Sequence, residues 1–505
     1  HAQDRLWQME LSRRTAQGRL SEIFGKSALE SDILTRTLNI YKLSQLAEKK
    51  QSKEVIEILK AYSAGINSYI NQISSSGLGR GSPEFFLFTS QIAPWRPADC
   101  IALMKLVGLQ STNKAEREIL RTQLMLENIN QKRLADIFEE PPLIDSGANR
   151  DMPISRNLFP ILKNYEATEF NYAIEKSYSN SFSSSGLTAS NIFASMPSRS
   201  ANGSSLVAID PHGFFSAPSN FMLVGIDFKT GPVMGGTIPG IPAILIGRGR
   251  RIGWGFANAY IDDQDLFLEK VNPNNQLEYF SPAGLSEFEK KREIINIKGE
   301  KPVTIDILKT QNGPILPGNV YGVNSIRPNG HEISINWTGL KVEDKSIEAF
   351  ISLMKATSIK EAQTALPLLT VPGQNILIAD KNNISIFTAG AVPDRDFFHS
   401  TQGKIPSLGW QKNNAWLGIK AFEENPSIIN PKSGILINTN NRITQKDFPN
   451  HISFDWGDSQ RIIRANNLLQ KRQFHTVNSF MEIQNDTVSI SARILLPLLA
   501  KSLWF

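Results

Sequence analysis

The chain has 505 residues, of which 41% are hydrophobic and 20% are charged, and its 54 Lys and Arg against 48 Asp and Glu give a formal net charge of +6. These proportions are those of a globular protein that can bury a substantial core. The charge is mild for this length and the basic residues form no block with interleaved aromatic residues, so a nucleic-acid partner is not expected. No long apolar run predicts a membrane-spanning helix, and the single cysteine, Cys100, excludes an internal disulfide framework.

The two ends of the chain have unfinished patterns. The chain opens on HAQDRLWQMELSRR, where Leu6, Met9 and Leu11 already follow a helical spacing with no clear capping residue ahead. It stops on RILLPLLAKSLWF, an apolar pattern that needs a partner to pack against. We interpret the chain as an internal fragment that lacks N-terminal and C-terminal segments, so the absence of a signal peptide is uninformative.

Residues 1–176 show mostly helical patterns. A long amphipathic helix is predicted from apolar residues that recur every three or four positions, namely Val55, Ile58, Leu59, Tyr62, Ile66, Tyr69, Ile70 and Ile73. A second helical tract covers roughly residues 98–138 and is closed by Pro141-Pro142. Residues 177–189 form a spacer that begins rich in Ser and Asn and is too polar to be buried.

From Ser190 onward the pattern changes to short apolar runs with alternating spacing, mostly bounded by Gly, Pro, Asn or Asp. These runs predict strands at 206–209, 221–226, 243–246, 333–337, 376–379 and 384–387. Helices are predicted at 346–355, at about 459–469 and from Val477. The predicted organisation is therefore a helical region over 1–176, a spacer over 177–189 that can be cut, and a sheet-rich region over 190–505.

A serine nucleophile needs a base, and one candidate arrangement is the set of motifs found in penicillin-binding enzymes. Three such motifs occur in the expected order: Ser111-Thr112-Asn113-Lys114, Tyr178-Ser179-Asn180 and Lys229-Thr230-Gly231. Against this interpretation, Ser111 lies inside an apolar helical tract, and Tyr178 lies in the polar spacer. The G-x-S-x-G strand-elbow pattern is absent from the sequence.

A second arrangement makes a serine the first residue of its own chain. Cleavage before Ser190 would expose an α-amino group whose unperturbed pKa of about 7.7–8.0 suits it to act as a base near neutral pH. The polar spacer supplies the accessible chain that such a cleavage requires. The strand residues that follow Ser190 would then hold the new N-terminus in place.

Short motifs along nearly the whole chain occur in one order, and they are His1-Ala2-Gln3-Asp4-Arg5, Ala189-Ser190-Asn191, Asp210-Pro211-His212, Gly236-Thr237-Ile238-Pro239-Gly240, Gly253-Trp254-Gly255, Asp262-Asp263-Gln264-Asp265, Gly390-Ala391-Val392-Pro393-Asp394-Arg395 and Asn440-Asn441-Arg442. They resemble the penicillin acylase family of N-terminal nucleophile hydrolases. The resemblance implies an α/β (α+β) fold, namely a four-layer αββα sandwich with a mostly helical first chain. It also implies hydrolysis of N-acyl amides, a heterodimer of two chains cut from one precursor, and a periplasmic or secreted location.

Within this resemblance, Ser190 is the nucleophile, exposed by autocatalytic cleavage of Ala189–Ser190, and the alternative is an ordinary loop serine. His212 matches a histidine that contacts the nucleophile in the branch acting on glutaryl-cephalosporins and fatty-acyl amides, although a strand-end histidine bonded to the backbone would give the same pattern. The implied substrates are small N-acyl amides: acyl-homoserine lactones, acylated peptides or the acyl side chains of β-lactams.

The tetrahedral intermediate carries an oxyanion, which needs hydrogen-bond donors already in place. Asn440 matches the side-chain donor of the family. The backbone N–H donor is expected at Asn258, or at Ala259 if the register differs by one. Arg461 matches the arginine that braces the asparagine, with a surface salt bridge as the alternative.

The turn Asp262-Asp263-Gln264-Asp265 offers hard oxygen ligands of the kind that calcium prefers. The resemblance implies one structural Ca²⁺ held by Asp262, Asp265, a backbone carbonyl at Gln264 and Glu118 from the first chain. Acidic turns that bind nothing are the simpler alternative.

A different class of function also stays open, namely a relative that is not cut and binds an acylated ligand or a partner protein without turnover. All the expected catalytic residue types are present, which favours the enzyme. Cleavage of the Ala189–Ser190 bond separates the two.

Overall fold

The computed structural model describes residues 1–75, 81–88, 92–127, 129, 133–134, 138, 189–213, 216–229, 231–444, 448–457 and 459–503. The predicted spacer before Ala189, the motif Tyr178-Ser179-Asn180 and the closing pair Pro141-Pro142 lie outside the described residues, as does Thr230.

The first part of the chain is helical, as predicted. Its helices are α1 (Ala2–Gln17), α2 (Ser21–Phe24), α3 (Leu29–Thr37), α4 (Ile40–Glu48), α5 (Lys53–Ser75), α6 (Glu84–Leu87), α7 (Pro97–Ser111) and α8 (Lys114–Leu126). Helix α5 confirms the long amphipathic prediction, because its buried face includes Val55, Leu59 and Ile66. The tract predicted from residue 98 is divided into α7 and α8, because Thr112 adopts an extended backbone conformation with φ −111° and ψ 148°.

A seven-stranded antiparallel sheet is the largest layer, with the strand order β19-β15-β14-β6-β5-β4-β3. Its strands are β3 (Met222–Phe228), β4 (Gly231–Thr237), β5 (Ile246–Arg248), β6 (Ile252–Asn258), β14 (Gln374–Asp380), β15 (Ile384–Ala389) and β19 (Ser427–Ile429). The predicted strand at 243–246 is wrong for its first three residues, which precede β5 outside the ladder, although the Leu245 N–H donates to the Gly236 carbonyl at 2.9 Å. Ala243, Ile244 and Leu245 are apolar because they are buried. An apolar run reports burial and says nothing of backbone pairing.

A second sheet of three antiparallel strands, in the order β2-β1-β20, faces the first. It consists of β1 (Ala189–Ser195), β2 (Leu206–His212) and β20 (Ile435–Asn438). Ile192 and Ala194 of β1 share a buried core with Ala257 of β6 and Leu377 of β14. Ser190 pairs with Pro211 of β2, whereas the β20 pairing begins two residues later at Ile192, so Ser190 lies where β1 is paired on one side.

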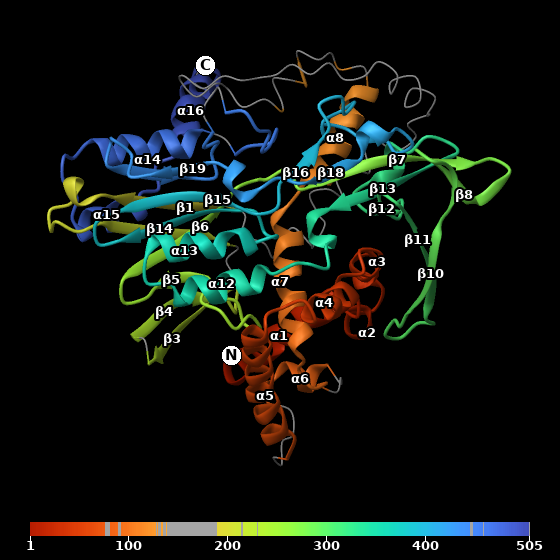
Figure 1. The fold of residues 1–505 in the computed structure, drawn as a ribbon, viewed down its shortest axis with the longest axis horizontal. Coiled ribbons are helices and arrows are strands. Elements are labelled where there is room, and N and C mark those ends of the chain that lie inside the picture. Colours follow the sequence, from red (N-terminus) through yellow and green to blue (C-terminus); the bar gives the residue numbers. More distant parts are fainter. Residues whose placement is uncertain are drawn as a thin grey trace.

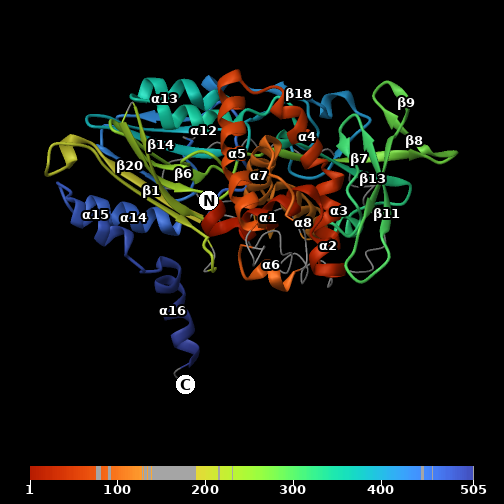
Figure 2. The same ribbon diagram turned by 90° about the horizontal axis from the view of Figure 1, so that it is seen from below.

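Helices cover the outer face of each sheet. Helices α14 (Gln460–Gln470) and α15 (Val477–Gln484) confirm two predictions and contribute Leu469 and Phe480 to a core with Phe193 of β1. Helix α12 (Ser346–Lys355), predicted with the same bounds, packs on the other sheet beside α13 (Ile359–Ala365). The result is the expected four-layer αββα sandwich (Figure 1 and Figure 2).

A further sheet lies beside the sandwich, in the order β13-β7-β8-β9 with β17 also paired to β7. The strands of this part are β7 (Gln264–Asn272), β8 (Asn275–Ser281), β9 (Gly284–Glu287), β10 (Glu289–Ile295), β11 (Val303–Thr310), β12 (Gly313–Pro314), β13 (His331–Trp337), β16 (Pro393–Arg395), β17 (Ser407–Leu408) and β18 (Trp416–Ile419). Of these only β13 was predicted. The side chains of β10 are mostly exposed and polar, so they produce no apolar run.

Helix α7 joins the two sheet systems. It is buried on nearly every side, with Cys100, Leu103 and Met104 in the core of the sandwich and Leu106 and Leu109 in the core against β7 and β13. Figure 1 shows α7 between the sandwich and the β7–β13 sheet. No helix among the described residues has the length and apolar character needed to cross a membrane.

The close approach of the two sandwich sheets predicts a stability effect at Gly255. A Cβ atom added there would lie 2.4 Å from Ile209 Cδ1 of β2, so Gly255→Ala should force the sheets apart and cost about 1–3 kcal/mol in thermal or urea unfolding. Gly225→Ala in β3 is the matched control, because nothing lies within 4 Å of its added Cβ. Equal unfolding midpoints for the two variants would contradict this account of the sheet interface.

Candidate active site

The candidate active site is centred on Ser190, near the start of β1. The residue is only 1% exposed, and its backbone N–H donates to Asn440 Oδ1 at 2.7 Å. Ala189 and Ser190 belong to one continuous strand here, so this donor is a peptide N–H. Cleavage of the preceding bond would convert the same nitrogen into an α-amine beside the same acceptor.

The Asn440 side chain bridges three elements. Its Oδ1 accepts from Ser190 and, at 2.9 Å, from Arg461 Nη2, while its Nδ2 donates to the backbone carbonyl of Asn258 at 3.1 Å. Asn440 has a left-handed backbone with φ 67°, a conformation that asparagine adopts more readily than most residues. The backbone N–H of Gly457 donates to the Asn440 carbonyl at 3.2 Å and helps to hold this turn.

Arg461 braces both Ser190 and Asn440 from helix α14. Besides Asn440, its Nη1 donates to the Ser190 carbonyl at 3.0 Å and to Asn191 Oδ1 at 3.0 Å. One guanidinium therefore orients the strand and the amide together, which its rigid planar fork allows. This contact sets Arg461 apart from a surface salt bridge.

Asn258 ends strand β6 beside these residues. Its Nδ2 donates to the Ser111 carbonyl at 2.6 Å, and its Oδ1 accepts from the Tyr260 N–H at 2.9 Å. The backbone N–H of Ala259, the alternative oxyanion donor, already donates to the Gly373 carbonyl at 3.2 Å. The structure therefore brings Ser190, Asn258, Asn440 and Arg461 together.

His212 is placed differently from the expectation. It pairs with Ala189 across the strands, so strand alternation puts its side chain on the face of Asn191 and not on that of Ser190. Its Nε2 lies 2.9 Å from Asp210 Oδ2 and 3.4 Å from Asn191 Nδ2. Asn191 lies between His212 and Arg461 and was not predicted as a site residue. Its place directly after Ser190 in the sequence could have indicated this role.

Among the described residues, Ser111 and Lys114 of the penicillin-binding alternative do not form a nucleophile and base pair. The Ser111 hydroxyl donates to the Val107 carbonyl at 2.7 Å within its own helix, and the Ser111 carbonyl accepts from Asn258. The Lys114 ammonium donates to Ser453 Oγ at 2.8 Å and to the Asp455 carbonyl at 3.1 Å, so the base of that arrangement points elsewhere.

Carboxylates gather where α8 of the first part meets β7 of the second. The Leu266 N–H lies 3.2 Å from Glu118 Oε1, and burial, followed by the nearby charges of Asp265 and Asp262, raises the pKa of Glu118 well above its ordinary value. Burial alone would also raise the pKa of Asp262, but Arg395 and His451 outweigh it and lower this pKa. Burial raises the pKa of Asp263 to about 6.

These residues do not have the disposition of a calcium site. Calcium takes six to eight oxygen ligands at about 2.3–2.6 Å. Here the Asp265 oxygens accept from Arg395 and Trp416, and Asp262 Oδ2 lies 2.8 Å from His451 Nε2. Among the described residues, no three or more His, Cys, Asp or Glu side chains converge in a way that could hold a metal ion. The calcium assignment stays a prediction that these contacts do not favour.

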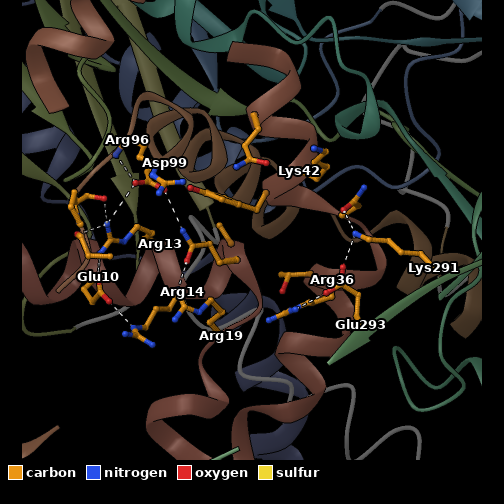
Figure 3. Close-up of a pocket in the computed structure, with 18 residues that line it drawn as sticks. Glu10, Arg13, Arg14, Arg19, Arg36, Lys42, Arg96, Asp99, Lys291 and Glu293 are labelled. Atoms are coloured by element: carbon orange, nitrogen blue, oxygen red, sulfur yellow. Dashed lines mark hydrogen bonds and ion pairs between the residues drawn. The ribbon is translucent and has the colours of Figure 1, made fainter. Parts of the chain in front are cut away.

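A cavity of about 370 Å³ lies at the N-terminal end of α7, about 20 Å by helix rise from the Ser111 end. It is lined by Asp99, Arg96 and charged residues of α1, α3, α4 and β10. Figure 3 shows its carboxylates facing basic side chains, such as Glu10 with Arg14 at 2.6 Å. It contains none of the candidate catalytic residues, whereas a cavity of about 10 Å³ lies beside Asn258. The candidate site at Ser190 is therefore separate from this larger cavity.

The arrangement is that of a buried serine whose backbone nitrogen and carbonyl are both held, with an amide donor beside it. The chain matches the Penicillin amidase family over residues 1–503, and it belongs to this family.

Individual relatives agree with the family match. The chain is 27% identical over 502 residues to an acyl-homoserine lactone acylase, QuiP, of Pseudomonas aeruginosa, covering 97% of this chain and 57% of that protein. It is 26% identical to the penicillin acylase 2 proenzyme of Pseudomonas sp. (97% and 61% covered) and 24% identical to penicillin G acylase of Escherichia coli (99% and 63% covered). The chain thus spans about 57–63% of the length of these relatives.

The fold also matches a solved structure. The thermostable penicillin G acylase from Alcaligenes faecalis superposes with a TM-score of 0.54 at 24% identity, over 62% of this chain and 55% of that chain. This likeness shows the shared N-terminal nucleophile hydrolase fold.

The bracing role of Arg461 predicts a loss of stability when it is replaced. Arg461→Met removes charged hydrogen bonds to Asn440, Asn191 and the Ser190 carbonyl, so unfolding should be easier by about 2–3 kcal/mol. Arg472→Met, which breaks an exposed pair with Glu482, should change stability by less than about 1 kcal/mol. Urea unfolding of both variants checks the contrast, and equal losses would show that Arg461 carries no special contact.

Proposed function

We propose that the chain is most of an N-terminal serine amidohydrolase, which hydrolyses an N-acyl amide to a carboxylic acid and an amine. One observation carries this proposal: the Ser190 nitrogen is already bound to Asn440, whose amide is braced by Arg461. A nitrogen held in this way becomes a positioned base once the bond to Ala189 is broken. The family membership of the chain supports the reaction class.

In the proposed reaction, the Ser190 hydroxyl attacks the carbonyl carbon of the substrate while the Ser190 α-amine accepts the hydroxyl proton. The carbonyl oxygen becomes an oxyanion, which Asn440 Nδ2 and the Asn258 N–H stabilise. In this structure Asn440 Nδ2 donates to the Asn258 carbonyl, so it exchanges that acceptor for the oxyanion. The amine leaves with the proton from the α-amine, and water then hydrolyses the acyl ester in the same way.

His212 is proposed as a positioning residue. Its Nε2 contact with Asp210 lies within β2 and orients the ring, which lies 3.4 Å from Nδ2 of Asn191, the β1 residue next to Ser190. For the substrate we propose acyl-homoserine lactones first, because relatives of that printed name match nearly the full length of the chain. Penicillin acylases match it as fully, so the acyl side chains of β-lactams are the second candidate. We further propose that cleavage leaves two chains that stay associated, and that the enzyme acts in the periplasm or outside the cell, as its family resemblance implies.

The cleavage itself is the first test. Full-length protein expressed from its gene should give two chains, the second beginning Ser-Asn-Ile-Phe-Ala, by intact mass and N-terminal sequencing. Ser190→Ala lacks the hydroxyl and should remain one chain, while Ser195→Ala, five residues along the same strand, should be cut normally. One uncut chain in a well-folded wild-type sample would favour the non-processing binder of acylated ligands.

The oxyanion donor is the second test. Asn440→Ala removes a donor, so kcat of the cleaved enzyme should fall by about 10²–10³, with either an acyl-homoserine lactone or penicillin G as substrate. Asn450→Ala is the control, because Asn450 is partly exposed and its side chain donates to the Glu424 carbonyl away from the site. A kcat within threefold of wild type for Asn440→Ala would remove Asn440 from the oxyanion hole.

A further inference from the structure

The junction of α8 and β7 contains five side chains, Glu118, Asp262, Asp265, Arg395 and His451, which we call the seam cluster. We propose that Arg395 is the resident cation of the seam cluster, and that its guanidinium holds the carboxylates together where a calcium ion was expected. This inference concerns ion pairs of the second part at its border with the first, and it does not depend on the proposed reaction.

Arg395 lies between the two aspartates. Its Nη2 is 2.6 Å from Asp265 Oδ1 and 3.2 Å from Asp262 Oδ2, and its Nε donates to Asp265 Oδ2 at 2.9 Å. The fork therefore binds Asp265 through both oxygens and reaches Asp262 with the same nitrogen. A metal ion that bridged Asp265 Oδ1 and Asp262 Oδ2 would lie where Nη2 lies, and the two cations would repel each other.

Other donors occupy further oxygen positions of the seam cluster. His451 Nε2 lies 2.8 Å from Asp262 Oδ2, and Trp416 Nε1 donates to Asp265 Oδ2 at 2.6 Å. Arg395 Nη2 also donates to the Asp262 carbonyl at 3.0 Å, so one of the nearest backbone oxygens is used as well. N–H donors thus take the positions that oxygen-seeking calcium would need.

The packing around Arg395 leaves little room for a second cation. The Arg395 side chain is 3% exposed and that of Asp265 is 0% exposed. A Cβ added at Gly403 would come within 2.6 Å of Asp265 Oδ1 and 3.0 Å of Arg395 Nη2, so the chain at Gly403 covers this ion pair closely. The Arg395 charge is therefore paired and desolvated, the condition in which losing one partner costs most.

A second buried cation belongs to Lys114, one turn from Glu118 on α8. Lys114 is 2% exposed, and its ammonium donates to Ser453 Oγ at 2.8 Å and to the Asp455 carbonyl at 3.1 Å. Glu118 meets the second part through the Leu266 N–H and needs no metal for that contact. Because these cations belong to side chains, a chelator cannot remove them.

The test uses the full-length wild-type protein, dialysed without chelator. Elemental analysis should find less than half a calcium ion per molecule. Adding EDTA or calcium chloride should change the melting temperature by less than about 2 °C, because a ligand that does not bind the folded state cannot stabilise it. Half an ion or more per molecule, or a larger shift with either reagent, would overturn the proposal.

Variants test Arg395 itself. Arg395→Met leaves buried carboxylates unpaired, so the melting temperature should fall by about 3–5 °C. Arg292→Met is the matched control, since Arg292 forks onto Asp306 at the surface, and it should lower the melting temperature by less than about 1 °C. If Arg395→Met does not fold, Arg395→Lys keeps the charge but loses the fork, and it should melt about 2 °C or more below wild type. Stability equal to the Arg292→Met control for whichever variant folds would overturn the proposal.

Discussion

The amide of Asn440 is the contact on which the candidate site depends. Its oxygen accepts from the Ser190 N–H and from Arg461, and its nitrogen donates to the Asn258 carbonyl. These partners come from β1, α14 and β6, which belong to three different layers of the sandwich. A buried amide that uses both of its ends fixes the spacing between those layers, because leaving either end unpaired would cost a buried hydrogen bond.

The sandwich makes this contact possible by bringing its sheets unusually close. Gly255 on β6 leaves space for Ile209 of β2, so the short sheet that carries Ser190 can lie against the long sheet that ends in Asn258. Helix α7 is buried between two sheet systems, and it reaches the site at its C-terminal end. The carbonyl of its last residue, Ser111, accepts from the Asn258 side chain. The helical first part therefore supports the site directly.

The seam cluster lies where the same two parts of the chain meet, and Glu118 is its member from the first part. Arg395 from β16 pairs with Asp262 and Asp265 around the start of β7, and Glu118 of α8 bonds the backbone of β7. Both parts bury charged groups there, and each charge has a partner of opposite sign or an N–H donor. Two chains produced by cleavage would stay together through these buried contacts and the shared cores. Separating them would leave buried charges unpaired and expose apolar surface to water.

Helices and strands could be predicted from the sequence where apolar residues kept one spacing over several helical turns or filled one buried strand. Helix α5 and helix α12 have strong amphipathic spacing, and β13, β14 and β15 are apolar runs that are buried in sheets. The strands β8 to β10 were not predicted, because most of their side chains are exposed. Strand β11 was missed although Val303, Ile305 and Ile307 alternate along it. Residues 243–245 were assigned to a strand because burial outside a strand ladder leaves the same signal.

For the site, the sequence by itself determined which residue types are available and their order, and motif resemblance selected Ser190, Asn440 and Arg461. The convergence of these residues was decided only by the tertiary structure, since Ser190 and Asn440 are 250 positions apart and meet through sheet pairing and helix packing. The same holds for His212, whose face is set by its pairing with Ala189, and for Arg395, whose place between two aspartates no local pattern reveals. Sequence patterns report local backbone preference and burial, whereas the partner of a buried polar group depends on which elements the whole fold brings together.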